Sequence, residues 1–297
     1  MPELPDITVY IEALESRIQQ HSIVDIKLQS PFLLRTAEIP LTDLIDRKVT
    51  RLQRIGKRIA IGFDDYWLIF HLMIAGRLHW KDSVKKMPGK SALIILKFDN
   101  GILYLTEAGK KKRASLHVVR GEEAVAEQDP GGKEIAELDL EAFSNLLTHT
   151  NHTLKRVLTD PRIYSGIGNA YSDEILHRAG LSPIKQSQKL SSDEIETLYS
   201  ATKDVLVEWT DRLRNESGDN FPEKVTAFRS EMMVHGRFGK NCPVCQTIVQ
   251  RIRYASNETN YCPRCQTDGK LLADRSLSRL LKKDWPKTIE ELERKKS

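Results

Sequence analysis

The sequence predicts a multidomain α+β protein: an N-terminal antiparallel β-sandwich preceded by a helix, then a helical domain, and a C-terminal zinc-ribbon finger. Three observations support this prediction. Short strand-forming segments bounded by turn signals extend to about residue 120, helical periodicity begins near residue 129, and all four cysteines fall in two Cys-x2-Cys pairs. A chain of 297 residues is long enough for two domains with separate cores.

The first expected element is an amphipathic helix that runs from near the N-terminus to about Gln20. Pro2 lies at its start, where a missing amide hydrogen costs nothing, and the acidic Glu3 and Asp6 suit the positive end of the helix dipole. The apolar residues recur at spacings of three and four, which places them on one face. They are Leu4, Ile7, Ile11, Leu14 and Ile18.

Strand-forming segments follow the helix. The turn signals Asp64-Asp65 and Asp99-Asn100-Gly101 each separate two such segments, which favours an antiparallel sandwich or barrel over a parallel sheet. The expected strands are Ile23 to Leu28, Arg58 to Phe63, Tyr66 to Met73, Ala92 to Phe98, Ile102 to Thr106 and Ala114 to Val119.

The second half of the chain is expected to be helical. A helix from about Ala170 to Ala179 ends at Gly180, a good C-terminal cap. Ser191 and Glu194 form a capping box that opens a long helix to about residue 214. The segment 218–240 appears irregular, and the tail is expected to form short helices.

These patterns divide the chain into domains, with a linker at Asp129-Pro130-Gly131-Gly132. The expected parts are a β-sandwich domain (1–128), a helical domain (129–233), the zinc finger (234–268) and a C-terminal tail (269–297).

Composition sets weak limits on the partner and the compartment. The formal net charge of +5 fits a polyanionic partner, although many ordinary soluble proteins share it. The cysteine pairs leave no cysteine for disulfides, and no apolar segment reaches the roughly 18 residues that span a membrane. We therefore expect a monomer without membrane attachment in the reducing cytoplasm, associated with the nucleoid if the source is bacterial.

The two cysteine pairs predict one structural zinc ion, bound by Cys242, Cys245, Cys262 and Cys265. Two thiolate pairs separated by a hairpin-length insert suit a tetrahedral site, whereas four unrelated buried thiols are the alternative. Because the protein fills all four positions, this ion cannot activate water, and catalysis must lie elsewhere. Basic residues around the finger would face a phosphate backbone. They are Arg237, Lys240, Arg251, Arg253 and Arg264.

Two further features suggest covalent chemistry on nucleic acid. Removal of the initiator methionine would leave Pro2 with a secondary amine, a nucleophile toward aldehydes and sugar anomeric carbons. Alone, a proline near a helix start is usually only a helix starter. Gly166-Ile167-Gly168-Asn169 precedes a helix and leaves backbone amides for a phosphate, although such turns are common.

The combination of motifs resembles the formamidopyrimidine-DNA glycosylase and endonuclease VIII family. The match runs in order from residue 2 to about 266. It consists of Met-Pro-Glu-Leu-Pro-Asp at 1–6, Arg54-Ile55-Gly56-Lys57-Arg58, Gly166-Ile167-Gly168-Asn169 before Glu174, and the four-cysteine finger. The resemblance implies a helix-two-turn-helix motif in the helical domain, and double-stranded DNA with a damaged base or an abasic site as the partner.

The resemblance also implies the activity of a bifunctional DNA glycosylase and abasic-site lyase of base excision repair. In the family, the residue that matches Pro2 attacks the anomeric carbon, expels the damaged base and forms an iminium intermediate, and β/δ elimination then cleaves the strand. Glu3 matches the glutamate that protonates the sugar ring oxygen. Lys57 aligns with a lysine that contacts phosphate and assists elimination, although a solvated turn lysine is the alternative. Asn169 and Lys155 match phosphate-binding residues.

Several positions depart from the family pattern. Ile74 replaces a wedge methionine, so an apolar wedge is kept. The segment 106–115 lacks the wedge aromatic and instead carries four basic residues that grip phosphate or form an exposed hairpin. They are Lys110, Lys111, Lys112 and Arg113. Asn257 replaces a finger arginine, which removes a charge from the phosphate contact.

Two alternative functions are compatible with the sequence. A non-catalytic or lyase-only damaged-DNA-binding protein of the same fold would explain the missing aromatic and Asn257. An RNA-associated zinc-ribbon protein would explain the finger but not Pro2-Glu3 with Lys57.

Overall fold

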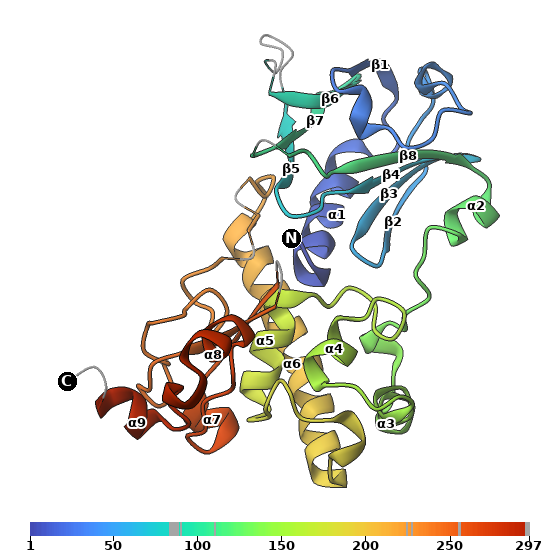
Figure 1. The fold of residues 1–297 in the computed structure, drawn as a ribbon. Coiled ribbons are helices and arrows are strands. Elements are labelled where there is room, and N and C mark those ends of the chain that lie inside the picture. The colour runs from blue at the N-terminus through green and yellow to red at the C-terminus, as the bar shows by residue number, and fades with distance from the viewer. Residues whose placement is uncertain are drawn as a thin grey trace. The chain divides into compact units, whose positions relative to one another are not determined.

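Two four-stranded antiparallel sheets form the N-terminal sandwich (Figure 1). One sheet has the order β1-β6-β7-β5 and the other has the order β2-β3-β4-β8. The strand bounds are β1 (Ile23–Leu28), β2 (Arg51–Ile55), β3 (Arg58–Phe63), β4 (Tyr66–His71), β5 (Gly76–Lys81), β6 (Ala92–Phe98), β7 (Ile102–Glu107) and β8 (Ser115–Arg120). The prediction of an antiparallel sandwich is confirmed.

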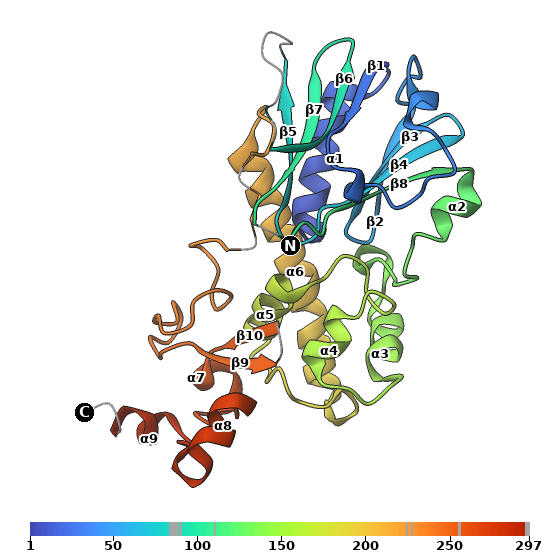
Figure 2. The ribbon, with the colours of Figure 1, turned by 45° about the horizontal axis from the view of Figure 1, so that its top comes forward.

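The helix α1 (Leu4–Ile18) shares one apolar core with both sheets, and Figure 2 shows it running alongside the strands. Its buried face consists of Ile7, Tyr10, Leu14 and Ile18, none of which is exposed to solvent. Removing this apolar surface from water is the main favourable contribution to docking the helix. The position of the N-terminus therefore follows from the packing of the core.

The structure corrects several predicted bounds. α1 ends at Ile18 because Gln20 adopts a left-handed φ of 66°, and β4 ends at His71 because the turn that follows places Met73 at φ 52°. β7 ends one residue later than predicted, and β8 is shifted by one residue. The strands β2 and β5 were not predicted.

The structure, a computed structural model, describes residues 1–82, 89, 91–109, 111–223, 225–226, 228–254 and 257–294. The chain divides into two units, residues 1–131 with 208–227 and residues 132–207 with 228–297. The helix α6 (Ser192–Ser217) contributes to both units. The predicted domain boundaries stay a prediction.

The second unit contains the finger and the helices beyond residue 132, with α6 shared between the two units. The predicted capping box at the start of α6 is confirmed, because the Ser191 amide donates to Glu194 Oε2 (2.9 Å) and the Glu194 amide donates to Ser191 Oγ (3.3 Å). Gly180 follows α5 at a left-handed φ of 66°, as expected for a C-cap. The helices are α3 (Leu140–Thr148), α4 (Leu154–Thr159), α5 (Asn169–Arg178), α7 (Pro263–Thr267), α8 (Arg275–Leu281) and α9 (Ile289–Arg294), and α2 (Glu122–Ala126) belongs to the first unit.

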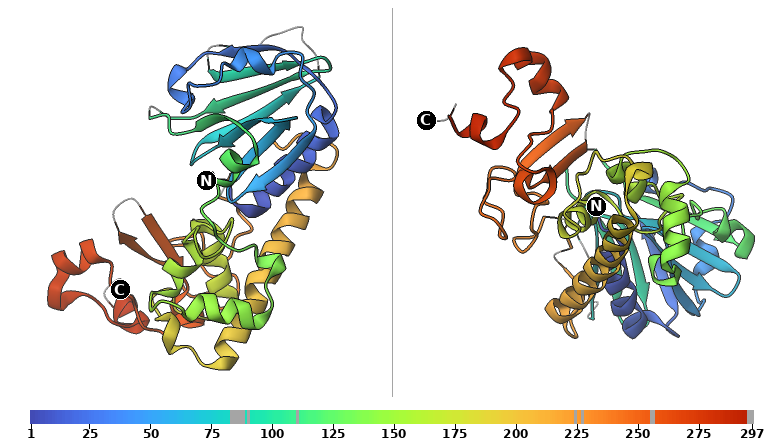
Figure 3. Two further views of the ribbon diagram at one scale, coloured as in Figure 1. Left: turned by 90° about the vertical axis from the view of Figure 1, so that its right-hand side faces the viewer. Right: turned by 90° about the horizontal axis from the view of Figure 1, so that it is seen from below.

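A two-stranded hairpin, β9 (Gln250–Tyr254) with β10 (Asn257–Tyr261), lies between the two cysteine pairs in the sequence. Figure 3 shows it beside the red helices of the tail. The short tail helices α8 and α9 confirm the prediction for this segment. Within the described residues, no helix is both long and apolar enough to cross a bilayer.

We predict that Gly76→Ala destabilises the sandwich. A Cβ at Gly76 would lie 2.3 Å from the carbonyl oxygen of Leu72, whose bond to the Gly76 amide closes the turn between β4 and β5. Overpacking of this kind costs about 1–3 kcal/mol. Gly89→Ala is the control, because a Cβ there meets nothing within 4 Å. Urea unfolding followed by circular dichroism measures the difference, and equal midpoints for the two variants would contradict the prediction.

Candidate functional sites

The start of α1 is buried and held by a local hydrogen bond. Pro2 is buried, and Glu3, the N-cap of α1, is only 2% exposed. The Glu3 amide donates to Asp6 Oδ2 at 3.0 Å, so Asp6 fixes the backbone one residue after Pro2. This arrangement satisfies one of the amides that a helix start leaves without an intrahelical partner.

The N-terminal amine lies in a mixed electrostatic environment. Burial lowers the pKa of the Met1 amine below its ordinary value, and the charges of Arg77 and Lys57 lower it further, whereas Glu3 and Asp6 raise it. The predicted residues Glu3 and Lys57 therefore both act on the N-terminus. Arg77, at the second position of β5, was not found from the sequence.

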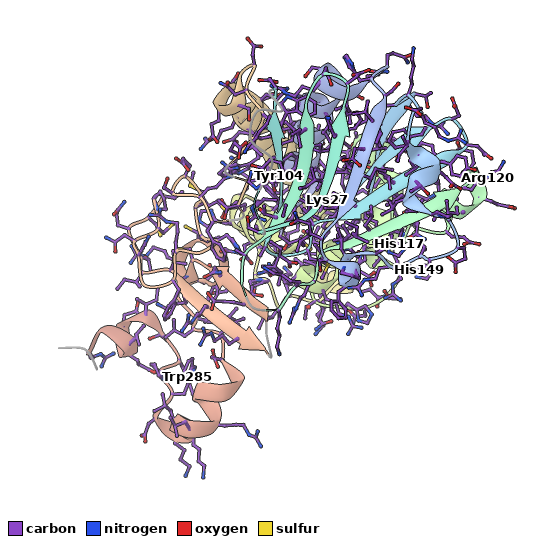
Figure 4. All side chains as sticks on the ribbon, turned by 90° about the horizontal axis from the view of Figure 1, so that it is seen from above. Lys27, Tyr104, His117, Arg120, His149 and Trp285 are labelled. Carbon is purple, nitrogen blue, oxygen red and sulfur yellow. The ribbon has the colours of Figure 1, made fainter. Side chains whose placement is uncertain are left out.

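Lys57 lies in the tight turn between β2 and β3. Ile55 pairs with Arg58 across this hairpin, and Gly56 takes a left-handed φ of 58° that glycine tolerates without strain. Nearby, burial lowers the pKa of His71 to about 4, with the charges of Arg58, Lys57 and His117 acting in the same direction. Figure 4 labels His117 on the face of β8. His71 is therefore neutral at physiological pH.

Two loops carry the other candidate residues of the first unit. Ile74 is 54% exposed in the turn between β4 and β5. Lys111, Lys112 and Arg113 are exposed after β7, and Lys110 lies outside the described residues.

Glu107 holds the backbone of the loop after β7 that carries the basic residues 111–113. Its side chain is 6% exposed and accepts hydrogen bonds from the Arg113 amide (2.9 Å) and the Ala114 amide (3.1 Å). Lys112 Nζ donates to the carbonyl oxygen of Glu107. The buried carboxylate therefore holds the backbone of the basic segment, a role that the sequence did not reveal.

In the second unit, Lys155 and Asn169 belong to one hydrogen-bonded cluster around α5. Lys155 Nζ donates to the carbonyl oxygen of Asn169 (2.7 Å) and forms an ion pair with the buried Asp173. Asn169 Nδ2 donates to the carbonyl oxygen of Glu258 in β10 (2.7 Å). With its side chain 13% exposed, Lys155 is an internal ion-pair partner as well as a candidate phosphate contact.

Glu174 holds the segment that leads into the finger. Its carboxylate accepts from the amides of Met233 (2.7 Å), Val234 (3.0 Å) and His235 (2.9 Å). Burial raises the pKa of Glu174, while these amide hydrogen bonds oppose the rise. The next residue toward the N-terminus, Asp173, accepts from His235 Nδ1 (2.7 Å) and from the Asn260 amide (3.1 Å).

The arginines of the finger hairpin are held by neighbouring side chains. Arg251 lies over the ring of Phe238 at 4.0 Å and pairs with Glu258 at 3.1 Å. Arg253 pairs with Glu258 at 3.2 Å, and its side chain is 56% exposed. Asn257 begins β10 opposite Tyr254, and its side chain is outside the described part of the structure.

The four predicted cysteines gather at one end of the finger. Cys245 Sγ lies 3.3 Å from Cys262 Sγ, and Cys242 and Cys262 are fully buried. The sulfurs of Cys242, Cys262 and Cys265 lie within 4.8 Å of one another and of a ring nitrogen of His177, a group that could hold a metal ion. His177 was not predicted.

Family comparisons agree with this arrangement. Residues 1–113 match the formamidopyrimidine-DNA glycosylase N-terminal domain, 129–213 match the formamidopyrimidine-DNA glycosylase H2TH domain, and 239–267 match a zinc finger found in FPG and IleRS. A formamidopyrimidine-DNA glycosylase from Desulfitobacterium hafniense is 31% identical over 281 residues, covering 90% of this chain and 100% of the relative. The chain belongs to the formamidopyrimidine-DNA glycosylase family. The resemblance found from the sequence is thus confirmed.

Other members of the formamidopyrimidine-DNA glycosylase family are similar over different lengths. A formamidopyrimidine-DNA glycosylase-like protein of Mycobacterium tuberculosis is 40% identical over 151 residues, which cover 51% of this chain and 94% of that protein. A Lactococcus lactis Fpg in complex with abasic-site DNA is 25% identical, with a TM-score of 0.79, and covers 89% of this chain and 99% of that one. A further complex of the Lactococcus enzyme contains DNA with an oxidized pyrimidine, with the same TM-score of 0.79.

We predict that Glu174→Gln loosens the segment before the finger. A glutamine side chain keeps one carbonyl oxygen but turns an NH2 group toward the amides of residues 233–235, so buried donors lose their acceptor at about 1–3 kcal/mol each. Limited proteolysis with mapping of cuts in residues 228–241, together with thermal unfolding, measures the effect. Glu196→Gln, on the exposed side of α6, is the matched control. Equal protease resistance of both variants would contradict the assigned role.

Proposed function

We propose that this protein is a base-excision-repair DNA glycosylase with abasic-site lyase activity. The observation that carries the proposal is the buried Pro2-Glu3 start of α1, where the amine lies in the field of Arg77, Lys57, Glu3 and Asp6. The proposed substrate is double-stranded DNA that contains a damaged base or an abasic site. The Lactococcus lactis complexes contain abasic-site DNA or DNA with an oxidized pyrimidine, which supports this substrate class.

The mechanism begins after removal of Met1. The secondary amine of Pro2 is then the N-terminus and lies near the same charged groups. The nitrogen lone pair attacks the anomeric carbon, the bond to the base breaks, and the base leaves with the bonding electrons while the amine gives up its proton. The bond between the anomeric carbon and the ring oxygen then breaks as the ring oxygen takes a proton, and the nitrogen lone pair forms a second bond to that carbon. Because a secondary amine cannot form a neutral imine, the product is a cationic iminium that acidifies the neighbouring sugar proton. Loss of that proton expels the 3′-phosphate in the β elimination, and the δ elimination expels the 5′-phosphate, so the strand is cleaved.

Glu3 and Lys57 assist these steps. Glu3 delivers a proton to the sugar ring oxygen as the base leaves, which general acid catalysis accelerates by about 10²–10⁴-fold. The hydrogen bond of its amide to Asp6 (3.0 Å) fixes its backbone, and its charge acts on the N-terminal amine. Lys57, at the tip of the β2–β3 turn, contacts the phosphate beside the lesion.

DNA binding is assigned to residues of both units. Ile74 is an exposed apolar wedge that fills the gap left when the damaged nucleotide is extruded from the duplex. The remaining predicted contacts are with phosphates or with the flipped nucleotide. They are Lys110, Lys111, Lys112, Arg113, Lys155, Asn169, Arg251, Arg253 and Asn257.

We also infer one structural zinc ion on Cys242, Cys245, Cys262 and Cys265. The donor set supports it, since thiolates are preferred zinc ligands, the sulfurs of Cys242, Cys262 and Cys265 lie within 4.8 Å of one another, and Cys245 Sγ lies 3.3 Å from Cys262 Sγ. When bound, the ion cross-links the two cysteine turns and takes no part in the chemistry. A monomeric state and a cytoplasmic location remain predictions from the sequence.

Sodium borohydride trapping tests the proposed activity. Reduction of the iminium should yield a covalent complex with lesion-containing or abasic-site DNA, visible as a shifted band in a denaturing gel. Pro2→Gly should reduce the yield strongly. Glu3→Gln should slow base excision by about 10²–10⁴-fold while leaving abasic-site cleavage less affected, because the base has already departed.

Two controls make the trapping result interpretable. Intact mass spectrometry must establish that Met1 is absent, since a retained methionine blocks the amine and favours a damaged-DNA-binding protein without glycosylase activity. Lys57→Ala, which removes the proposed phosphate contact, should reduce strand cleavage. Lys27→Ala, which removes an exposed lysine of β1 labelled in Figure 4, is its matched control. Absence of any trapped complex from protein lacking Met1 would contradict the proposal.

We predict that the pH midpoint of single-turnover trapping rises in Arg77→Gln. Only the neutral amine is nucleophilic, and burial together with the charge of Arg77 lowers the pKa of the Met1 amine. We expect the same charge to act on the Pro2 amine after Met1 is removed, so Arg77→Gln should move the midpoint upward. A midpoint that Arg77→Gln leaves unchanged would rule out this electrostatic control.

A further inference from the structure

One face of α5 contacts the finger along its whole length. Asn169, Asp173 and His177 recur at intervals of four residues, which places their side chains on the same side of a helix. Asn169 donates to the Glu258 carbonyl oxygen at 2.7 Å, and Asp173 accepts from the Asn260 amide at 3.1 Å. His177, the third residue of this series, lies next to the cysteine cluster.

His177 is buried, 7% exposed, in the last turn of α5. Its Nε2 lies 3.4 Å from Cys242 Sγ, a distance at which an N–H group can donate a hydrogen bond to sulfur. Buried ring nitrogens require a partner, and this sulfur supplies one. A metal-bound thiolate carries no proton, so in the loaded protein the hydrogen of this pair lies on the imidazole.

The other cysteines show why a donor is needed here. Four thiolates and one divalent zinc ion leave a net charge of −2 in a buried site, and N–H groups directed at sulfur offset that charge. The Thr247 amide hydrogen-bonds to Cys245, and the Cys265 amide hydrogen-bonds to Cys262. At Cys242, which is fully buried, the imidazole of His177 occupies the equivalent place.

We propose that His177 is a positioning residue of the zinc centre, which donates Nε2–H to the Cys242 thiolate and thereby ties the metal to α5. The inference rests on the zinc ion of the proposed function. The helix α5 thereby links two sites. It begins at Asn169, the predicted phosphate contact, and its last turn lies beside the metal.

The cluster offers five donor atoms to an ion that takes four. His177 lies within 4.8 Å of three of the sulfurs, those of Cys242, Cys262 and Cys265, and Cys245 joins the group through its 3.3 Å contact with Cys262. We assign the fourth ligand position to Cys245 because a thiolate is charged and each Cys-x2-Cys turn then supplies two sulfurs. The imidazole therefore belongs to the outer shell, where loss of such a partner typically weakens metal binding by 10–100-fold.

Zinc content, zinc affinity and the ligand set together test this proposal. Plasma mass spectrometry should find one zinc ion per wild-type chain, and X-ray absorption at the zinc edge should show four sulfur ligands. In competition with a chelator, His177→Phe should bind zinc about 10–100-fold more weakly. His177→Gln, which retains an N–H donor near the Nε2 position, should recover part of this loss. His149→Phe, at an exposed histidine after α3, should behave as wild type.

The outcomes separate the two proposals. Wild-type affinity in His177→Phe, with one zinc ion present, would overturn the role of His177 and leave the zinc site intact. A nitrogen ligand in the wild-type absorption spectrum would overturn the outer-shell assignment, and this measurement does not depend on any variant folding. A wild-type chain without zinc would overturn the zinc site and this inference together. None of these outcomes affects the borohydride test of the glycosylase proposal.

Discussion

The hydrogen bond from the Glu3 amide to Asp6 Oδ2 (3.0 Å) is the interaction on which the proposed chemistry depends. It defines how α1 begins, and the unexposed side chains of Ile7, Tyr10 and Leu14 fix the rest of that helix in the core of the sandwich. A nucleophilic nitrogen on a chain end would ordinarily be poorly positioned, because termini are ordered only where packing or hydrogen bonds hold them. Here Pro2 and Glu3 lie at the start of a buried helix, so the packing of the core also fixes their positions.

A buried helix plays the corresponding part in the second unit. α5 presents Asn169, Asp173 and His177 to the finger at successive turns, while Glu174 accepts three amides from the segment that leads into it. Burying a carboxylate costs free energy unless its oxygens accept hydrogen bonds. Glu174 accepts them from backbone amides, and Asp173 accepts them from Lys155, His235 and a backbone amide. The candidate metal centre and the candidate phosphate contact are thereby supported by one element.

Features encoded by short, local patterns could be predicted from the sequence. β1, β3 and β6 have the predicted bounds because their apolar segments are flanked by turn residues, and the cysteine spacing indicated the finger directly. β2 was missed because it is an edge strand with only one buried residue.

Glu107, Glu174 and His177 were missed because each acts on a loop, amide or sulfur whose position depends on the tertiary fold. Glu174, for example, binds the amide of residue 235, which is 61 positions away. The i, i+4, i+8 spacing of Asn169, Asp173 and His177 was visible, but nothing local identified what that face contacts.

The covalent bond to DNA is expected at the nitrogen of Pro2, a position that no other proposed chemistry would produce. Mass spectrometry of the borohydride-reduced complex, after nuclease and protease digestion, identifies the residue that carries the sugar remnant. The remnant should be on the N-terminal peptide, with fragment ions that assign it to Pro2. A remnant on Lys57, or on any other lysine of a protein that has lost Met1, would contradict it.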